Sequence, residues 1–193
     1  MATTTPTRPP VFNLPNQLTA SRFVLALVLF VLIEQQSWKA CLGVFVLASF
    51  TDWLDGYLAR KQGLMSTLGR NLDPLVDKVL VCGAYIFLLP EGYQDGRGWL
   101  QPWMVTVVVA RELIITSLRS FMETQSASFG ADWLGKLKMG LQCAALIAIF
   151  VVLEWHEVPE LRPVRDVFVY AMVAATALSG LQYLYRAFAL LRA

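Results

Sequence analysis

The sequence has little charge and no strong excess of either sign. Charged residues make up 16% of the 193 residues, against about 25% in an average soluble protein. The formal net charge is only +2, and the aromatic residues lie inside apolar stretches rather than among clustered lysines and arginines. This pattern argues against a nucleic-acid-binding protein.

Cysteine and histidine are also scarce. Cys41, Cys82 and Cys143 are odd in number, lie in different apolar stretches and show no CxxC spacing, which excludes a disulfide framework and a cysteine-based metal site. We interpret them as buried free thiols, and we expect His156, the single histidine, to lie on the surface. The first 23 residues hold four prolines and no apolar core, so we expect no removed signal peptide.

Apolar residues, in contrast, make up 56% of the chain. They gather in blocks at residues 23–33, 40–50, 79–89, 102–118, 139–153 and 167–191. Several blocks fall short of the roughly 20 residues that cross a bilayer core, so polar flanks must complete them. We predict an all-α integral membrane bundle of six transmembrane helices in a single domain of residues 1–193. Residues 1–12 would be a flexible tail and residues 13–22 a short interfacial helix.

The distribution of positive charge predicts the orientation of this bundle. Six spans place both termini on one side, and with cytoplasmic termini twelve of the sixteen lysines and arginines lie on or near the cytoplasmic side. The polar ends of four spans would then meet in a cavity open to the cytoplasm, and ionisable residues in such positions usually mark a functional site. We therefore predict a multi-pass protein of a bacterial-type inner membrane, with its active site facing the cytoplasm.

The stretch "DWLDGYLARKQGLMSTLGRNLDPLVD" at residues 52–77 carries four aspartates at helical spacing. One helical face would hold Asp52, Asp55, Gly56 and Ala59, and a face of the next helix would hold Gly69, Asp73 and Asp77. Four carboxylates in a cleft of low dielectric repel one another unless cations neutralise them, and oxygen ligands suit Mg²⁺, Mn²⁺ or Ca²⁺. We predict a divalent metal site. Solvation of a helix end would explain one aspartate, but not four with this spacing.

The pattern Asp52-x2-Asp55-Gly56-x2-Ala59-Arg60-x8-Gly69-x3-Asp73-x3-Asp77 matches every fixed position of a known signature, so the chain resembles the CDP-alcohol phosphotransferase family. Members transfer a phosphatidyl or similar group from a CDP-linked donor to an alcohol and release CMP, in a six-helix membrane fold that is usually a homodimer. The segments "NLPNQLTASR" (13–22), "ARELIITSLR" (110–119) and "GKLKMGLQ" (135–142) resemble those of phosphatidylglycerophosphate synthases. Those synthases often have a small residue at the position of Arg70 and threonine at that of Met139.

This resemblance implies roles for the signature residues. Two Mg²⁺ or Mn²⁺ ions would be bound by Asp52, Asp55, Asp73 and Asp77. The CDP moiety would be held by Asn16, Thr19, Asp52, Gly56, Ala59, Arg60 and Gly69. Asp77 would also be the general base that takes the proton from the attacking hydroxyl.

An acceptor that carries a phosphate needs fixed cations. The predicted topology brings Arg111, Arg119, Lys136 and Lys138 to the cavity, and the two arginines are eight residues apart on one helix. The lysines could instead extend to the membrane interface as ordinary snorkelling residues. We expect Glu112 to pair with a neighbouring cation.

The predicted reaction is transfer of the phosphatidyl group from CDP-diacylglycerol to sn-glycerol 3-phosphate, which yields phosphatidylglycerol phosphate and CMP. The alternatives are the same chemistry with phosphatidylglycerol or an inositol phosphate as acceptor, a divalent-cation channel or carrier, and an inactive scaffold. A channel or carrier would not need the small residues and the arginine of the signature. An inactive scaffold would not need every position of the signature to be occupied.

Overall fold

A computed structural model of the chain describes residues 14–62, 67–93, 98–124 and 133–191, with side chains for residues 20–51, 75–93, 98–122 and 133–189. The elements in these ranges are all α-helices: α1 (Leu14–Glu34), α2 (Trp38–Gln62), α3 (Thr67–Phe87), α4 (Leu89–Gly92), α5 (Pro102–Thr124), α6 (Trp133–Glu154) and α7 (Leu161–Leu191). The predicted all-α class is therefore confirmed for this part of the chain. The predicted flexible tail lies outside it.

The first helix is longer than predicted. The expected interfacial segment at residues 13–22 and the first expected span are parts of one helix, α1. Pro15 is the only proline in α1 and lies in its first turn, where a helix tolerates the missing N–H, and α1 contains no glycine. The sequence therefore has no element that would interrupt the helix at residue 22.

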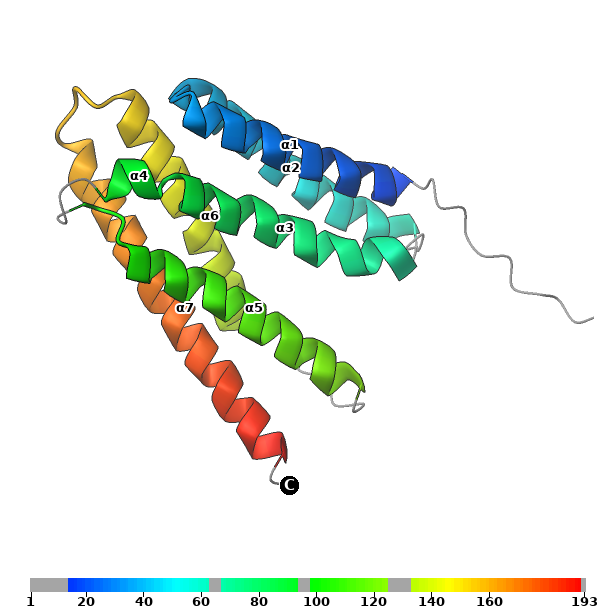
Figure 1. The fold of residues 1–193 in the computed structure, drawn as a ribbon. Coiled ribbons are helices and arrows are strands. Elements are labelled where there is room, and N and C mark those ends of the chain that lie inside the picture. The colour runs from blue at the N-terminus through cyan, green and yellow to red at the C-terminus, as the bar shows by residue number, and fades with distance from the viewer. Residues whose placement is uncertain (1–13, 63–66, 94–97, 125–132, 192–193) are drawn as a thin grey trace, which may run out of the picture.

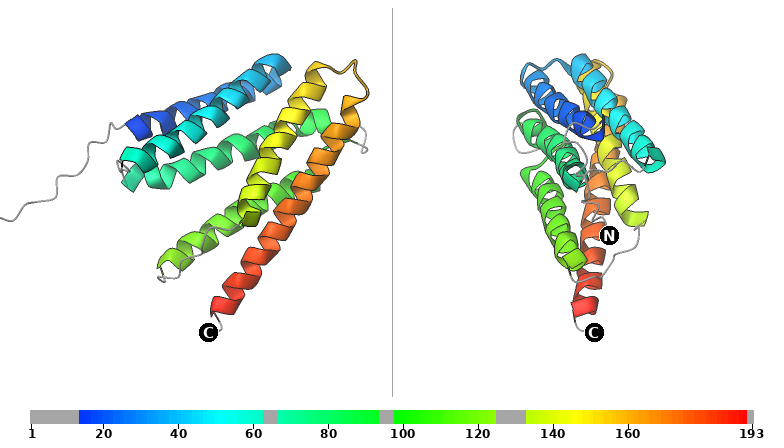
Figure 2. Two further views of the ribbon diagram at one scale, coloured as in Figure 1. Left: turned by 180° about the vertical axis from the view of Figure 1, so that it is seen from behind. Right: turned by 90° about the vertical axis from the view of Figure 1, so that its right-hand side faces the viewer.

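The helices form two groups, one of α1, α2 and α3 and the other of α5, α6 and α7 (Figure 1). The groups converge at the end that holds the α1–α2 turn, α4 and the α6–α7 connection, and they diverge toward the opposite end (Figures 1 and 2). At the diverging end lie the last turns of α2, α5 and α7 and the first turns of α1, α3 and α6. The polar helix ends that the sequence predicts on one side thus lie at one end of the molecule.

The hydrophobic core lies toward the converging end. It combines buried residues from six helices, among them Leu29, Phe45, Tyr85, Met104, Phe150 and Met172. The two groups are joined by packing of α2 against α6 and of α3 against α5 and α6, while α7 packs against α5 and α6. Because the apolar side chains pack at the converging end, the polar residues near the diverging end are free to form a site.

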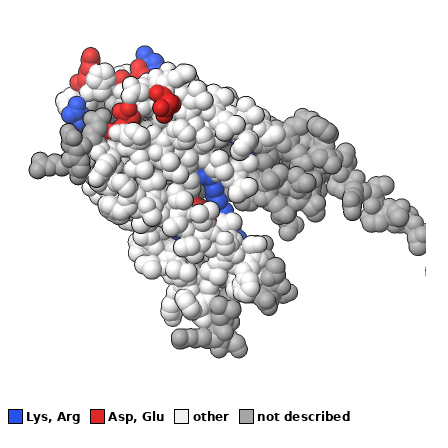
Figure 3. Space-filling model, viewed as in Figure 1, with Lys and Arg blue, Asp and Glu red and all other residues white. Residues whose placement is uncertain are grey.

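Much of the apolar surface is exposed. Figure 3 shows charged side chains gathered at the converging end and uncharged surface along the described sides of the helices. On α7 alone Val167, Tyr170, Leu178, Leu181 and Phe188 are each more than half exposed. Contiguous exposed apolar surface of this kind marks contact with another protein or with a membrane.

Two helices in the described ranges, Trp133–Glu154 and Leu161–Ala189, are long and apolar enough to cross a membrane. Within the described residues, α2 adds a shorter apolar stretch, Trp38–Thr51. The six predicted spans are thus confirmed only as helices, and six crossings stay a prediction. Cys41 is buried as expected, Cys82 and Cys143 are half-buried and form no disulfide, and His156 is exposed.

Candidate active site

The signature residues lie on two consecutive helices. The last part of α2 carries Asp52, Asp55, Gly56, Ala59 and Arg60, and α3 carries Gly69, Asp73 and Asp77. The two predicted nucleotide-binding residues Asn16 and Thr19 lie in the first turns of α1. Of all these side chains the structure describes only that of Asp77, so the predicted contacts of the others with metal and nucleotide lie outside the described residues.

Asp77 forms an ion pair with a buried arginine of α1. Nη1 of Arg22 lies 2.5 Å from Oδ1 of Asp77, and the two side chains are 2% and 29% exposed. A guanidinium removed from water needs a close counter-ion, because an uncompensated buried charge costs several kcal/mol (roughly 3–5). Arg22 therefore restrains the carboxylate of Asp77 and joins the N-terminal helix to the signature.

The next residue on α3 points to a different helix. Nζ of Lys78 donates a hydrogen bond to Oγ1 of Thr116 on α5. The hydroxyl of Thr116 in turn donates to the main-chain oxygen of Glu112, one turn earlier, at 2.6 Å. Successive residues of a helix are rotated by about 100°, so α3 presents Asp77 toward α1 and Lys78 toward α5.

Glu112 lies at the centre of a buried cluster of charges. Only 6% of it is exposed, and its Oε1 accepts a hydrogen bond from Nζ of Lys138 on α6 and lies 3.2 Å from Nη1 of Arg111. The prediction that Glu112 pairs with a neighbouring cation is confirmed. Lysine or arginine atoms are visible in a hollow between the two groups of helices (Figure 3).

Both predicted arginines of α5 contact α7. Nη2 of Arg111 donates to Oγ of Ser179, and Nη2 of Arg119 donates to the hydroxyl of Tyr183, each at 2.6 Å. The guanidinium carbons of Arg111 and Arg119 lie 5.7 and 5.6 Å from the centre of the Tyr183 ring. Nε of Arg111 is buried and has no hydrogen-bond partner among the described residues.

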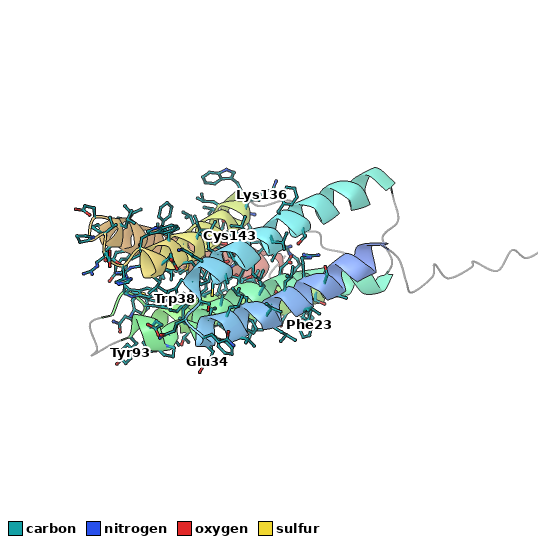
Figure 4. The ribbon with its side chains drawn as sticks, turned by 90° about the horizontal axis from the view of Figure 1, so that it is seen from above. Phe23, Glu34, Trp38, Tyr93, Lys136 and Cys143 are labelled. Atoms are coloured by element: carbon teal, nitrogen blue, oxygen red, sulfur yellow. The ribbon has the colours of Figure 1, made fainter. Side chains whose placement is uncertain are left out.

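The two predicted lysines of α6 differ. Lys138 is 5% exposed and belongs to the cluster. Lys136 is exposed near the start of α6, at the edge of the bundle in Figure 4, and makes no hydrogen bond or ion pair with the described residues. The structure thus brings Arg111 and Lys138 together at Glu112, places the exposed Arg119 beside Tyr183 two turns further along α5, and leaves Lys136 outside.

Replacing Glu112 by Gln is expected to lower the thermal midpoint of unfolding, because Lys138 and Arg111 would keep their charges without the buried carboxylate. Breaking a buried pair in this way costs about 3–5 kcal/mol. The midpoint is measured by intrinsic fluorescence of the purified protein in detergent.

The double variant Glu112→Gln with Lys138→Met serves as the control, because it removes one of the uncompensated charges and should recover part of the loss. Equal midpoints for the single variant and the unmodified protein would contradict a stabilising role for Glu112.

Several residues of the site were not predicted from the sequence: Arg22, Lys78, Ser179 and Tyr183. Arg22 stands at the start of a long apolar run, and Lys78 follows Asp77, so both positions carry a weak signal. Ser179 and Tyr183 are four residues apart and share a helical face, but no residue in their surroundings indicates which helix that face meets.

Comparison with known proteins gives the family. A family model described as CDP-alcohol phosphatidyltransferase matches residues 12–185. A protein of Bacillus subtilis (strain 168) named CDP-diacylglycerol–glycerol-3-phosphate 3-phosphatidyltransferase is 33% identical over 191 residues, covering 90% of this chain and 94% of the relative. A protein of Sodalis glossinidius with the same name is 33% identical over 181 residues, covering 91% and 94%.

A chloroplastic/mitochondrial protein of Arabidopsis thaliana, named CDP-diacylglycerol–glycerol-3-phosphate 3-phosphatidyltransferase 1, is 34% identical over 147 residues. That match covers 70% of this chain and 50% of the plant protein. The family model spans nearly the whole chain, including the signature at residues 52–77 and the cationic cluster on α5 and α6. The chain therefore belongs to the CDP-alcohol phosphatidyltransferase family.

Proposed function

We propose that this enzyme transfers the phosphatidyl group of CDP-diacylglycerol to sn-glycerol 3-phosphate, which yields phosphatidylglycerol phosphate and CMP. The names of the relatives described above support this reaction. The observation that carries the proposal is the composition of the cluster: Lys78, Arg111 and Lys138 lie around one buried carboxylate, Glu112, and the exposed Arg119 adds a fourth cation beside Tyr183. A buried excess of positive charge favours binding of an anion.

The chemical form of these cations suits a phosphate monoester. A guanidinium offers a planar set of donors that matches phosphate oxygens, and a lysine adds a point charge. Arg111 keeps a buried Nε with no partner in the described part of the chain, so it retains a donor for a ligand. Phosphatidylglycerol, the acceptor in the alternative reaction, carries a diester with one negative charge and needs fewer cations.

The neighbouring residues Asp77 and Lys78 connect the reacting centre with this cluster. We propose that Asp77 accepts the proton of the 1-hydroxyl of the acceptor as the oxygen attacks the lipid-side phosphorus. The bond from that phosphorus to the bridging oxygen breaks, and its electron pair leaves with CMP. Arg22 would keep the carboxylate of Asp77 oriented, while Lys78 and the cations of α5 and α6 hold the acceptor's phosphate.

The four aspartates of α2 and α3 are the proposed metal ligands. Carboxylate oxygens are the donor set that Mg²⁺ and Mn²⁺ prefer, so the residue types fit one or two such ions. Among the described residues no group of three acidic, histidine or cysteine side chains could hold a metal ion, and of the four aspartates only Asp77 has a described side chain. A bound ion at Asp52, Asp55, Asp73 and Asp77 would neutralise charge on the diphosphate.

The remaining finer assignments are also proposals. Asn16, Thr19, Gly56, Ala59, Arg60 and Gly69 would contact the CDP moiety, with Asp52 shared between nucleotide and metal. The protein would cross an inner membrane six times, form a homodimer and open its site to the cytoplasm. The diverging end of the helices, which carries the signature, supports a site near one membrane surface (Figure 2).

Release of CMP from CDP-diacylglycerol by purified protein tests this function. We expect release that requires both Mg²⁺ or Mn²⁺ and glycerol 3-phosphate, and chelation with EDTA should abolish it. Separate reactions with phosphatidylglycerol and inositol phosphate serve as controls for the acceptor. If only one of these compounds stimulates metal-dependent release of CMP, that compound is the acceptor in place of glycerol 3-phosphate. If folded protein releases no CMP under any of these conditions, the proposed reaction is wrong.

A further inference from the structure

A row of buried hydroxyl groups lies along α7. Thr176, Ser179 and Tyr183 are separated by three and four residues, so they share one face of the helix. Their exposed fractions are 0%, 0% and 3%. A buried hydroxyl destabilises the fold unless it is hydrogen-bonded. We therefore expect hydrogen-bond partners for these hydroxyls on the helices packed against α7.

Two of these hydroxyls meet the arginines of α5. Ser179 accepts from Arg111 and Tyr183 from Arg119, each at 2.6 Å. Tyr183 makes a second type of contact, because its ring lies 5.7 Å from the guanidinium carbon of Arg111 and 5.6 Å from that of Arg119. One side chain of α7 therefore contacts both cations.

Arg111 and Arg119 are not neighbours on the surface of α5. Residues eight apart on a helix are separated by about 12 Å along the axis, and the two side chains are rotated by about 80° from each other. Like charges also repel. The electron-rich face of an aromatic ring attracts cations, so the ring of Tyr183 contacts both guanidinium groups and links them.

We propose that Tyr183, assisted by Ser179, is a positioning residue that holds Arg111 and Arg119 in place for the phosphate monoester of the acceptor. This inference rests on the proposed function. Tyr183 acts through the two arginines and need not touch the substrate. Removing it should loosen the binding of the acceptor and leave the binding of CDP-diacylglycerol unchanged.

Replacement of Tyr183 by Leu removes both the ring and the hydroxyl, whereas Tyr183→Phe removes only the hydroxyl. We expect Tyr183→Leu to raise the KM for glycerol 3-phosphate by about tenfold, and Tyr183→Phe to raise it less. Ser179→Ala should resemble Tyr183→Phe. In all three variants the KM for CDP-diacylglycerol should stay within about twofold of the unmodified value.

Tyr185→Leu is the matched control, because Tyr185 lies two residues further on the same helix with 77% of it exposed. This variant should change neither KM. The thermal midpoint of every variant is measured in parallel, and the Phe and Ala variants keep the test valid if Tyr183→Leu fails to fold.

A direct binding measurement separates positioning from general stability. Isothermal titration of purified protein with inorganic phosphate should give a dissociation constant that rises in Tyr183→Leu and not in Tyr185→Leu. An unchanged KM for glycerol 3-phosphate in Tyr183→Leu, or an equal rise in both KM values, would overturn the inference. If the unmodified protein shows no turnover with glycerol 3-phosphate, the proposed function fails, and the phosphate titration still decides the role of Tyr183.

Discussion

Replacing Asp77 by Asn is expected to abolish release of CMP while the protein remains folded. Asparagine has nearly the same shape but cannot accept a proton, and general-base catalysis contributes about 10²- to 10⁴-fold to a rate. The measurement is the initial rate of CMP release from CDP-diacylglycerol at saturating glycerol 3-phosphate. Full activity in Asp77→Asn would contradict the assignment of the base.

Asp166→Asn is the matched control for this substitution. Asp166 also forms an ion pair with an arginine, at 2.8 Å from Nη2 of Arg165, but it lies in the second turn of α7, far along the chain from the signature. Its side chain is 42% exposed, so the variant should keep normal turnover. Activity lost in both variants would indicate a general effect of removing an ion pair.

Loss of activity in Asp77→Asn could have a second cause, because the substitution also leaves the charge of Arg22 without this counter-ion. The double variant Arg22→Gln with Asp77→Asn neutralises both partners. We expect it to recover most of any loss in the thermal midpoint and none of the activity. Recovery of activity would mean that the ion pair, and not proton transfer, is what the reaction requires.

Replacing Arg111 by Gln is expected to raise the KM for glycerol 3-phosphate by about ten- to a hundredfold. A hydrogen bond to a charged group is worth about 1.5–3 kcal/mol, and each 1.4 kcal/mol corresponds to a factor of ten. The KM for CDP-diacylglycerol should change little, since the donor contacts are proposed on α1, α2 and α3. Arg111→Lys keeps the charge but loses the planar donors, and should recover only part of the affinity.

The control for Arg111 is Arg162→Gln. Arg162 is exposed at the start of α7, and within the described part of the chain its Nη2 donates one long hydrogen bond, of 3.4 Å, to the main-chain oxygen of His156. This variant should match the unmodified protein in both KM values. If Arg111→Gln instead raises the KM for CDP-diacylglycerol and not that for glycerol 3-phosphate, Arg111 binds CDP-diacylglycerol and not the acceptor.

The sequence predicted the family because the signature is a pattern of spacing along two consecutive helices. The signature from Asp52 to Asp77 is a local pattern, and the family that it indicated is confirmed by the family match. Arg111 and Lys138 were predicted as site residues because ionisable residues beside apolar stretches are costly unless they serve a function, and their role in binding the acceptor stays a prediction. The helix bounds were less accurate, since α1 continues through the expected interfacial segment without a break.

The partners of these residues were decided by the packing of helices that are distant in the sequence. Arg22 and Asp77 are 55 residues apart, and Arg119 and Tyr183 are 64 apart. Spacing shows which residues share a face of one helix, but the rotation and neighbours of that face follow from how all the helices pack their apolar surfaces. The amino-acid pattern alone therefore indicates the aspartates and the cations, while only the bundle joins Arg22 to Asp77 and Tyr183 to the two arginines.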